Sequence, residues 1–283
     1  EIVVITRDIE RNKSLKMIPN LKLVPASISD SKTIRDVLKN AEIVVNTIGI
    51  LNEFDQINTF ENIHFKFLQR LSQEIKVNKI KRFLHISSLN AKIGQMSDYL
   101  HTKGKAEDFI LNEMNSFCNT TIFRPSIVFG DEDSFFNKFA KLLKFIPIFP
   151  LACPYARFQP IYVGDLTDFM ISCISNIETY NKKIDTVGPK IYTFNELIKL
   201  TTKTMGIRRV IIPLNDSLSK AQAYVFQNLP GKLFTIDNYY SLQIDSVSEN
   251  GYVGKTTVEQ TLPNYLNIKD ESEELRKKAG RKK

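Results

Sequence analysis

Short apolar runs alternate with amphipathic stretches along the first half of the chain, and this alternation limits the possible folds most strongly. The apolar runs, rich in Val and Ile, occupy 1–6, 21–25, 41–46, 82–87 and 120–125. Helical patterns lie between them, over 31–39, 62–76 and 103–114. Continuously apolar strands separated by helices are typical of a parallel sheet that is buried on both faces. The sequence therefore predicts an α/β fold: a Rossmann-like, doubly wound parallel sheet.

A tyrosine and a lysine four residues apart follow the strand pattern 82–87, in the run Asp98-Tyr-Leu-His-Thr-Lys103. Residues with this spacing share one face of a helix, so the Tyr99 phenol and the Lys103 ammonium can point into one pocket. A neighbouring cation favours the phenolate, and we expect Lys103 to lower the pKa of Tyr99. Such a phenol suits proton donation to a carbonyl or a hydrogen bond to a ribose hydroxyl.

Ser87 and Ser88 precede this motif and can add a hydroxyl that orients a substrate oxygen. Tyr99, Lys103, Ser88 and Ser87 are therefore our candidate catalytic residues. The alternative for the same motif is an ordinary helix face with a lysine that extends to solvent.

Ligands of doubly wound sheets bind outside the carboxyl ends of the strands. Our candidate residues lie at those ends in this chain. We predict that they bind a nucleotide together with Tyr99 and Lys103; they are Arg7, Ser27, Ile28, Asn46, Thr47, Ile48, Gly49, Pro125 and Ser126.

A glycine-rich phosphate loop is missing from the sequence. A dinucleotide fold normally opens with a strand and a glycine-rich turn at a helix N-terminus, but none of the 11 glycines falls in such a pattern. The chain opens with Glu1, directly in a strand pattern. The first strand of such a sheet lies in its middle, and each buried backbone amide left unpaired costs about 1–3 kcal/mol. We therefore expect a further strand and a glycine-rich loop before Glu1.

Arg7 bears on the choice of cofactor. An acidic residue at the end of the second strand of this fold accepts from the adenosine ribose hydroxyls, whereas an arginine accommodates a 2′-phosphate. The sequence favours NADP(H) over NAD(H) on this ground. Two alternatives remain: Asp8 is the residue that faces the ribose, or the segment is a solvated charged loop.

Four motifs resemble those of the extended and atypical short-chain dehydrogenase/reductases. They are Asn46-Thr-Ile-Gly-Ile-Leu51, Tyr99-x-x-x-Lys103, Arg124-Pro-Ser-Ile-Val-Phe-Gly130 and Phe158-Gln-Pro-Ile-Tyr-Val-Gly-Asp165. The later run 229–238, with Asp245-Ser-Val-Ser248 after it, is similar to the C-terminal signature of one subfamily, the nucleotide-binding accessory subunit of respiratory complex I and its bacterial relatives.

This resemblance implies a Rossmann-type domain, a tightly held NADPH, complex I subunits as partners, and a structural or assembly role. It also implies a place at the inner membrane, on the cytoplasmic face in a bacterium or the matrix side in a mitochondrion. The alternative is an active NADP-dependent reductase or epimerase/dehydratase that uses Tyr99 and Lys103. Ser27 stands where many relatives have an aspartate that contacts adenine, and a hydroxyl accepts more weakly than a carboxylate.

The expected domains are a nucleotide-binding domain over 1–130 with a return segment at 156–175, and a smaller C-terminal α/β lobe over 131–265. Residues 266–283 form a basic tail, expected to be disordered, within a chain of net charge +8. Such a tail can contact an anionic membrane at about 1 kcal/mol per basic residue. Neither a nucleic-acid motif nor metal-like cysteine spacing is evident, so neither ligand is expected.

Overall fold

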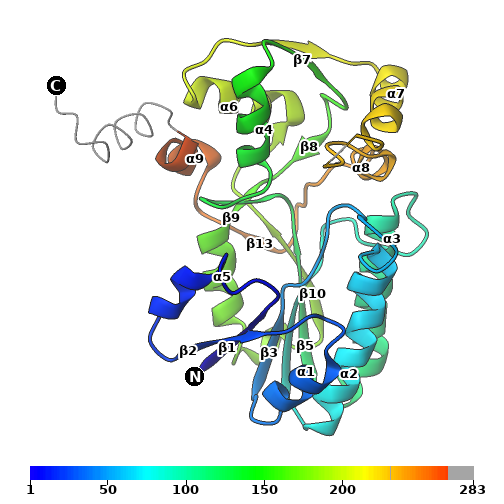
Figure 1. The fold of residues 1–283 in the computed structure, drawn as a ribbon, viewed down its shortest axis with the longest axis vertical. Coiled ribbons are helices and arrows are strands. Elements are labelled where there is room, and N and C mark those ends of the chain that lie inside the picture. The colour runs from blue at the N-terminus through cyan, green and yellow to red at the C-terminus, as the bar shows by residue number, and fades with distance from the viewer. Residues whose placement is uncertain (230, 267–283) are drawn as a thin grey trace, which may run out of the picture.

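A five-stranded parallel sheet forms the centre of the computed structural model, which describes residues 1–229 and 231–266 (Figure 1). Its strand order is β13-β10-β5-β4-β3. The strands are β3 (Ile43–Asn46), β4 (Arg82–Ile86), β5 (Asn119–Pro125), β10 (Lys182–Val187) and β13 (Tyr252–Val253). All pairs are parallel, so the loops after the strands meet at one edge of the sheet.

The first two strands form a separate parallel pair, β1 (Ile2–Thr6) with β2 (Leu21–Pro25). Among the described residues, β1 has β2 as its only strand neighbour, and β3 has only β4. The expected further strand and glycine-rich loop stay a prediction.

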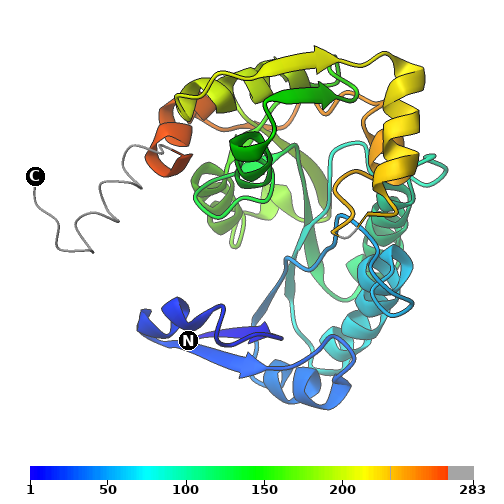
Figure 2. The same cartoon turned by 45° about the horizontal axis from the view of Figure 1, so that its top comes forward.

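Helices cover both faces of the central sheet (Figures 1 and 2). One face carries α1 (Ser31–Leu38), α2 (Phe67–Val77) and α3 (Asp98–Glu113), with a π-helical turn η2 (Glu61–Lys66) before α2 and a 3-10 turn η3 (Met114–Ser116) after α3. The other face carries α5 (Val163–Ser172). The 3-10 turn η1 (Lys13–Met17) lies on the same side of the molecule as α5 (Figure 1).

Adjacent residues of the strands pack into the two opposite layers. Phe83 and Ile122 belong to the core under α1, α2 and α3, while Leu84 and Phe123 belong to the core under α5. The predicted two-sided burial is therefore confirmed for β4 and β5, whereas Ile43 and Val45 of β3 are 38% and 48% exposed. Burying this alternating set on both faces stabilises the sheet at roughly 25 cal/mol per Å² of apolar surface.

A second lobe lies beyond the carboxyl ends of the strands and has its own apolar core around Phe129, Phe136 and Leu197. Its helices are α4 (Phe136–Phe145), α6 (Phe194–Thr204), α7 (Asp216–Phe226), α8 (Ile236–Ser241) and α9 (Val258–Leu266). The 3-10 turn η4 (Ile177–Thr179) precedes β10 of the central sheet. Its strands form three pairs: β6 (Val128–Phe129) with β9 (Ile161–Tyr162), β7 (Ile148–Leu151) with β12 (Val210–Pro213), and β8 (Arg157–Phe158) with β11 (Tyr192–Thr193).

Two boundaries differ from the sequence analysis. Strands β10 and β13 extend the central sheet, although their residues lie within the range assigned to the second lobe. Helix α3 begins at Asp98, five residues before the predicted start at Lys103, because the Ser97 hydroxyl accepts a hydrogen bond from the Leu100 amide (3.3 Å). This cap brings Tyr99 onto the same helix as Lys103.

Arg82 is a buried arginine at the start of β4, only 5% exposed. Its guanidinium donates to the carbonyl oxygens of Cys173 (2.7 Å) and Ile174 (2.9 Å) and to the Thr121 hydroxyl (2.7 Å). The same group lies over the Tyr180 ring, 4.5 Å from its centroid. One side chain thus connects β4, β5 and the end of α5, and burial lowers the pKa of Arg82.

We expect Arg82→Met to lower the free energy of unfolding by about 3 kcal/mol or more, because it leaves several buried acceptors without a donor. Urea denaturation of the wild-type and variant chains measures the loss. Arg35→Met is the matched control, since Arg35 pairs with Glu74 on the surface and its loss should change stability little. Equal effects of the two substitutions would contradict the assigned role of Arg82.

Candidate nucleotide-binding site

Lys103 is buried on α3, with 4% of its surface exposed. Its ammonium donates to the backbone oxygen of Ile86 at the end of β4 (3.0 Å). Burial lowers the pKa of Lys103 to about 8, while Glu107 acts in the opposite direction. The ammonium has three N–H donors, and Ile86 takes one. The others are available to a ligand.

Tyr99 lies one helical turn before Lys103 and is half-buried between two rings. Its ring meets those of His64 and Phe60 edge-on, at centroid distances of 5.5 and 5.9 Å. Burial raises the pKa of Tyr99, a hydrogen bond with Ser88 lowers it, and Asp237 raises it, with a net shift upward. The prediction that Tyr99 has a lowered pKa is therefore wrong. Desolvation of the phenol is the largest cause of the upward shift in its pKa, and Asp237 adds to it.

The two candidate serines face different partners. Ser88 reaches the Tyr99 hydroxyl, as expected for a residue of the same site. The buried Ser87 hydroxyl instead donates to the Glu107 carboxylate (2.6 Å). Ser88 is thus the serine that the structure brings to Tyr99, and Ser87 helps to hold α3 on the sheet.

The loop after β3 runs past Lys103. The buried Asn46 side chain lies 3.1 Å from Nδ1 of His85, and its oxygen accepts from the Ile48 amide (3.1 Å). A Cβ placed on Gly49 would come within 3.2 Å of Lys103 Nζ. Glycine therefore keeps the space beside the ammonium open, and Asn46, Ile48 and Gly49 lie at the Lys103 end of the site.

Two histidines belong to this site, although no sequence pattern groups them. His64 Nε2 accepts from the Ile50 amide (3.2 Å), so its Nδ1 carries the proton and donates to the Thr102 hydroxyl (3.0 Å). Burial and the positive charge of Lys103 lower the pKa of His64 to about 3. Burial also lowers the pKa of His85 well below its usual value, and His85 Nε2 has no partner among the described residues.

These features fit one end of a dinucleotide. The remaining Lys103 donors and the partnerless His85 nitrogen are buried polar groups, and Gly49 leaves space beside the Lys103 ammonium. Lys103 and Tyr99 are suited to hold ribose hydroxyls. A group of three or more side chains that could bind a metal does not occur in 1–229 or 231–266.

The remaining predicted residues make their contacts with residues other than Tyr99 and Lys103. Arg7 is exposed and donates to the Asn58 side chain (3.5 Å), and the Ser27 hydroxyl lies 3.0 Å from that of Ser29. Ser126 donates to the Ser246 backbone oxygen (2.7 Å), and its neighbour Pro125 is buried at the end of β5. Thr47 is exposed in the loop after β3.

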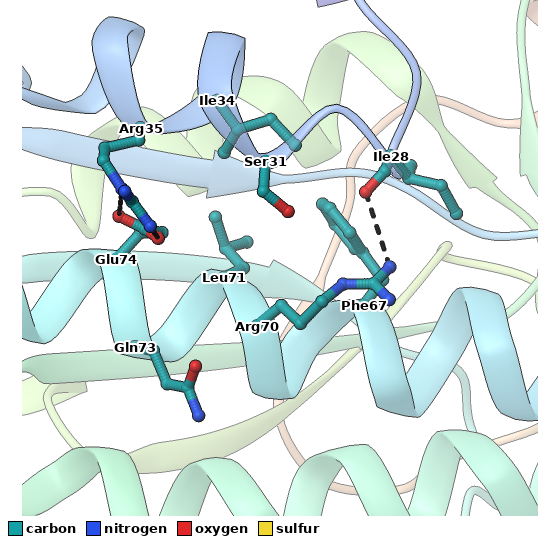
Figure 3. A pocket seen from close by; sticks show the side chains of 9 residues that line it. All are labelled: Ile28, Ser31, Ile34, Arg35, Phe67, Arg70, Leu71, Gln73 and Glu74. Carbon is teal, nitrogen blue, oxygen red and sulfur yellow. Dashed lines mark hydrogen bonds and ion pairs between the residues drawn. The ribbon is translucent and has the colours of Figure 1, made fainter.

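An open pocket of about 150 Å³ lies between α1 and α2, near β2 rather than Tyr99 (Figure 3). Ile28 is the one predicted nucleotide-binding residue in its wall, where the Ile28 oxygen accepts from Arg70 (3.4 Å). The Arg35–Glu74 ion pair (2.8 Å) forms another part of the wall. Its distance from the buried polar groups makes this pocket a weaker candidate than the Tyr99 site.

A segment of the second lobe, residues 231–241, crosses to the start of α3; we call it the closing segment. Its Asp237 carboxylate accepts from the Ser97 hydroxyl (3.1 Å) and the Tyr99 amide (3.3 Å). A carboxylate at this position also complements the positive end of the α3 dipole. Burial raises the pKa of Asp237, while the hydrogen bonds act in the opposite direction.

The closing segment also holds the loop that follows Gly49. Asn52 donates to the Lys232 oxygen (3.2 Å), and Asn238 donates to the Leu51 oxygen (3.3 Å). Lys232 donates to the Glu53 oxygen in addition. The second lobe is therefore fastened to both sides of the site, at the α3 N-terminus and at the loop after β3.

Comparison with known proteins gives this arrangement a context. Residues 1–137 match the family described as NAD(P)H-binding. The chain is 25% identical over 238 residues to the mitochondrial NADH dehydrogenase [ubiquinone] 1 alpha subcomplex subunit 9 of Dictyostelium discoideum, covering 82% of this chain and 64% of the relative. It is 30% identical over 174 residues to the subunit of that name from Mus musculus, covering 60% and 44%. The chain spans 44% to 64% of the length of such curated relatives.

Solved structures with the same fold include sugar-nucleotide enzymes. A dTDP-glucose 4,6-dehydratase from Bacillus anthracis in complex with NAD aligns with a TM-score of 0.68 at 14% identity, over 97% of this chain and 89% of that one. A UDP-glucose 4-epimerase from Thermotoga maritima gives the same score and identity, over 96% and 91%. Residues 1–137 thus match an NAD(P)H-binding family, the chain is homologous to subunits named for NADH dehydrogenase [ubiquinone], and it shares the fold of these sugar-nucleotide enzymes.

The buried neutral histidines predict a loss of stability in mild acid. His64 takes up a proton near pH 6.5 when unfolded but only near pH 3 when folded, so the unfolded chain binds more protons between these values. Because protonation favours the unfolded chain, the free energy of unfolding is highest above about pH 6.5 and decreases as the pH falls toward 3. We expect the melting temperature to fall between pH 7.5 and pH 5, and His64→Gln to reduce this slope.

His101→Gln is the control, because His101 bonds the Gly94 amide at an exposed turn. It should leave the slope unchanged. A slope in His64→Gln as steep as in the wild type would show that His64 is not the group responsible.

Proposed function

We propose that this chain is the nucleotide-binding part of an accessory or assembly subunit of respiratory complex I, in which NADP(H) is held for structural reasons. Its homology to subunits named for that complex supports the assignment. The match to an NAD(P)H-binding family over 1–137 supports the ligand class.

The closing segment is the observation that carries the structural role. It bonds to the amide of Tyr99 itself, through Asp237, and to the loop after Gly49, through Asn238 and Lys232. A substrate that enters and leaves between the lobes on this side would have to break these contacts in each cycle. A resident nucleotide would not. The arrangement therefore favours a cofactor that stays in place and stabilises the fold by binding to it.

Attachment of the subunit at the inner membrane, on the cytoplasmic or matrix side, follows from the same proposal. No helix within 1–229 or 231–266 is long and apolar enough to span a bilayer. Residues 267–283 lie outside the described part of the chain, so contact of the basic tail with an anionic membrane stays a prediction.

The proposed preference for NADP(H) depends on Arg7. We expect Arg7→Ala to weaken NADPH binding and to leave NADH binding nearly unchanged. A charge-assisted hydrogen bond to phosphate contributes about 1.5–3 kcal/mol, which corresponds to a roughly tenfold or larger loss. Isothermal titration with both cofactors measures it, with Arg11→Ala as the control. Equal weakening of both cofactors would refute the role of Arg7.

Tyr99 and Lys103 separate a structural nucleotide from catalysis. Tyr99→Phe keeps the ring against His64 and removes one hydroxyl, so a structural nucleotide should leave complex I assembly and respiration almost normal. Lys103→Ala should impair assembly more, because it removes buried donors and loosens the cofactor. Both variants are tested by complementation of a strain that lacks the native protein.

Retained cofactor in purified Tyr99→Phe protein is the control for that experiment. Failure of Tyr99→Phe to restore respiration, with cofactor and assembly intact, would favour the second candidate function. That function is a reductase or epimerase with Tyr99 as the acid or base, supported by the contact of Ser88 with the Tyr99 hydroxyl.

A further inference from the structure

The strand pair β7–β12 has one buried and one exposed face. Phe149, Leu151 and Ile211 face inward and pack in the core of the second lobe. On the outward face, Ile148 and Val210 are paired across the strands and are 56% and 59% exposed. Pro150 and Ile212 form the next outward pair, and Ile212 is 45% exposed. This ribbon lies at the end of the lobe farthest from β1 and β2 (Figures 1 and 2).

The end of α4 continues this surface. Phe145, the last residue of α4, is 85% exposed, three residues before Ile148. Arg209 donates to the Leu143 oxygen (2.6 Å) and so ties the end of α4 to the start of β12. Lys141 is exposed one turn before Phe145 on the same side of the helix. We call Phe145, Ile148, Pro150, Val210 and Ile212 the outer apolar face.

The segments that form the outer apolar face carry basic residues. The segments 136–155 and 197–215, which form the ribbon and its flanks, contain no Asp or Glu. They contain seven basic residues: Lys138, Lys141, Lys144, Lys199, Lys203, Arg208 and Arg209. Arg208, directly before β12, is exposed. Exposed apolar side chains beside exposed cations such as Lys141 and Arg208 are suited to a surface that is anionic outside and apolar beneath.

We propose that the outer apolar face docks on the surface of an anionic phospholipid membrane. Phe145, Ile148, Val210 and Ile212 enter the boundary between headgroups and acyl chains, and Lys141 and Arg208 contact the lipid phosphates. The ribbon is poorly suited to pairing with a strand of another protein, because Pro147 and Pro150 remove amide donors along β7. A lipid surface needs no such donors.

Flotation with vesicles tests this docking on the whole chain, without any complex I subunit, so the result is independent of the proposed function. The vesicles are phosphatidylcholine alone or with about 30% phosphatidylserine. One variant combines Phe145→Ser, Ile148→Thr and Val210→Thr, which keep β-branched residues in the strands. A second combines Lys141→Glu and Arg208→Glu. Controls are Ile171→Thr and Val77→Thr, which are 65% and 72% exposed elsewhere, and Lys66→Glu.

We expect the wild-type chain and the controls to bind the anionic vesicles, and added salt to weaken this binding. Each of the two combined variants should bind about tenfold more weakly or worse, since a basic residue near the surface contributes about 1 kcal/mol and buried apolar area adds to it. Circular dichroism and thermal melting identify any variant that fails to fold, and single substitutions then replace the combination. Wild-type and variant chains that bind equally would place the contact elsewhere, for instance in the basic tail. Binding only to an acidic protein, with none to vesicles, would overturn the proposal.

Discussion

The placement of α3 on the sheet is the constraint on which the site depends, and the buried Glu107 carboxylate sets it. Glu107 is fully buried, accepts from Ser87 on the chain after β4, and pairs with Arg124 of β5 (3.2 Å) and Lys183 of β10 (3.0 Å). A single carboxylate thus joins one helix to three neighbouring strands. Loss of Arg124 or Lys183 would leave the buried carboxylate with one of its two cations, which destabilises the fold. Since Lys103 lies one turn before Glu107, the same contacts fix the position of its ammonium.

Burial away from water sets the direction of the pKa shifts in the site. Burial moves Tyr99, Lys103, His64 and His85 toward their neutral forms, each in the direction that desolvation requires. A raised Tyr99 pKa suits a phenol that remains protonated and donates a hydrogen bond. It suits a proton-transfer group less, because that role needs a pKa near the working pH. The electrostatics therefore agree with a ribose-binding role for Tyr99.

The sequence predicted the parts of this fold that depend on local pattern. Strand β2 was bounded correctly at 21–25, because a short run rich in Leu and Val is visible in the residues themselves. The start of α3 was missed because its cap, Ser97, follows a loop without helical periodicity. The partners of the site were missed for a different reason. His64 meets Thr102 across 38 residues, and Asp237 meets Tyr99 across 138, and no spacing rule connects residues that far apart.

The C-terminal signature acquires a physical meaning from those long-range contacts. Thr235 and Asn238 form a reciprocal capping box at the start of α8, and this cap presents Asp237 to α3. Thr235 and Asn238 also bond to Asn52 and Leu51 of the loop after β3. The same few residues therefore begin a helix, cap a second helix and hold a loop of the candidate nucleotide site. A nucleotide that orders this loop would strengthen the attachment of the second lobe, and firm attachment of that lobe would in turn retain the nucleotide. Such reciprocal stabilisation serves a subunit that must keep one shape within an assembly better than an enzyme that must open to exchange substrate.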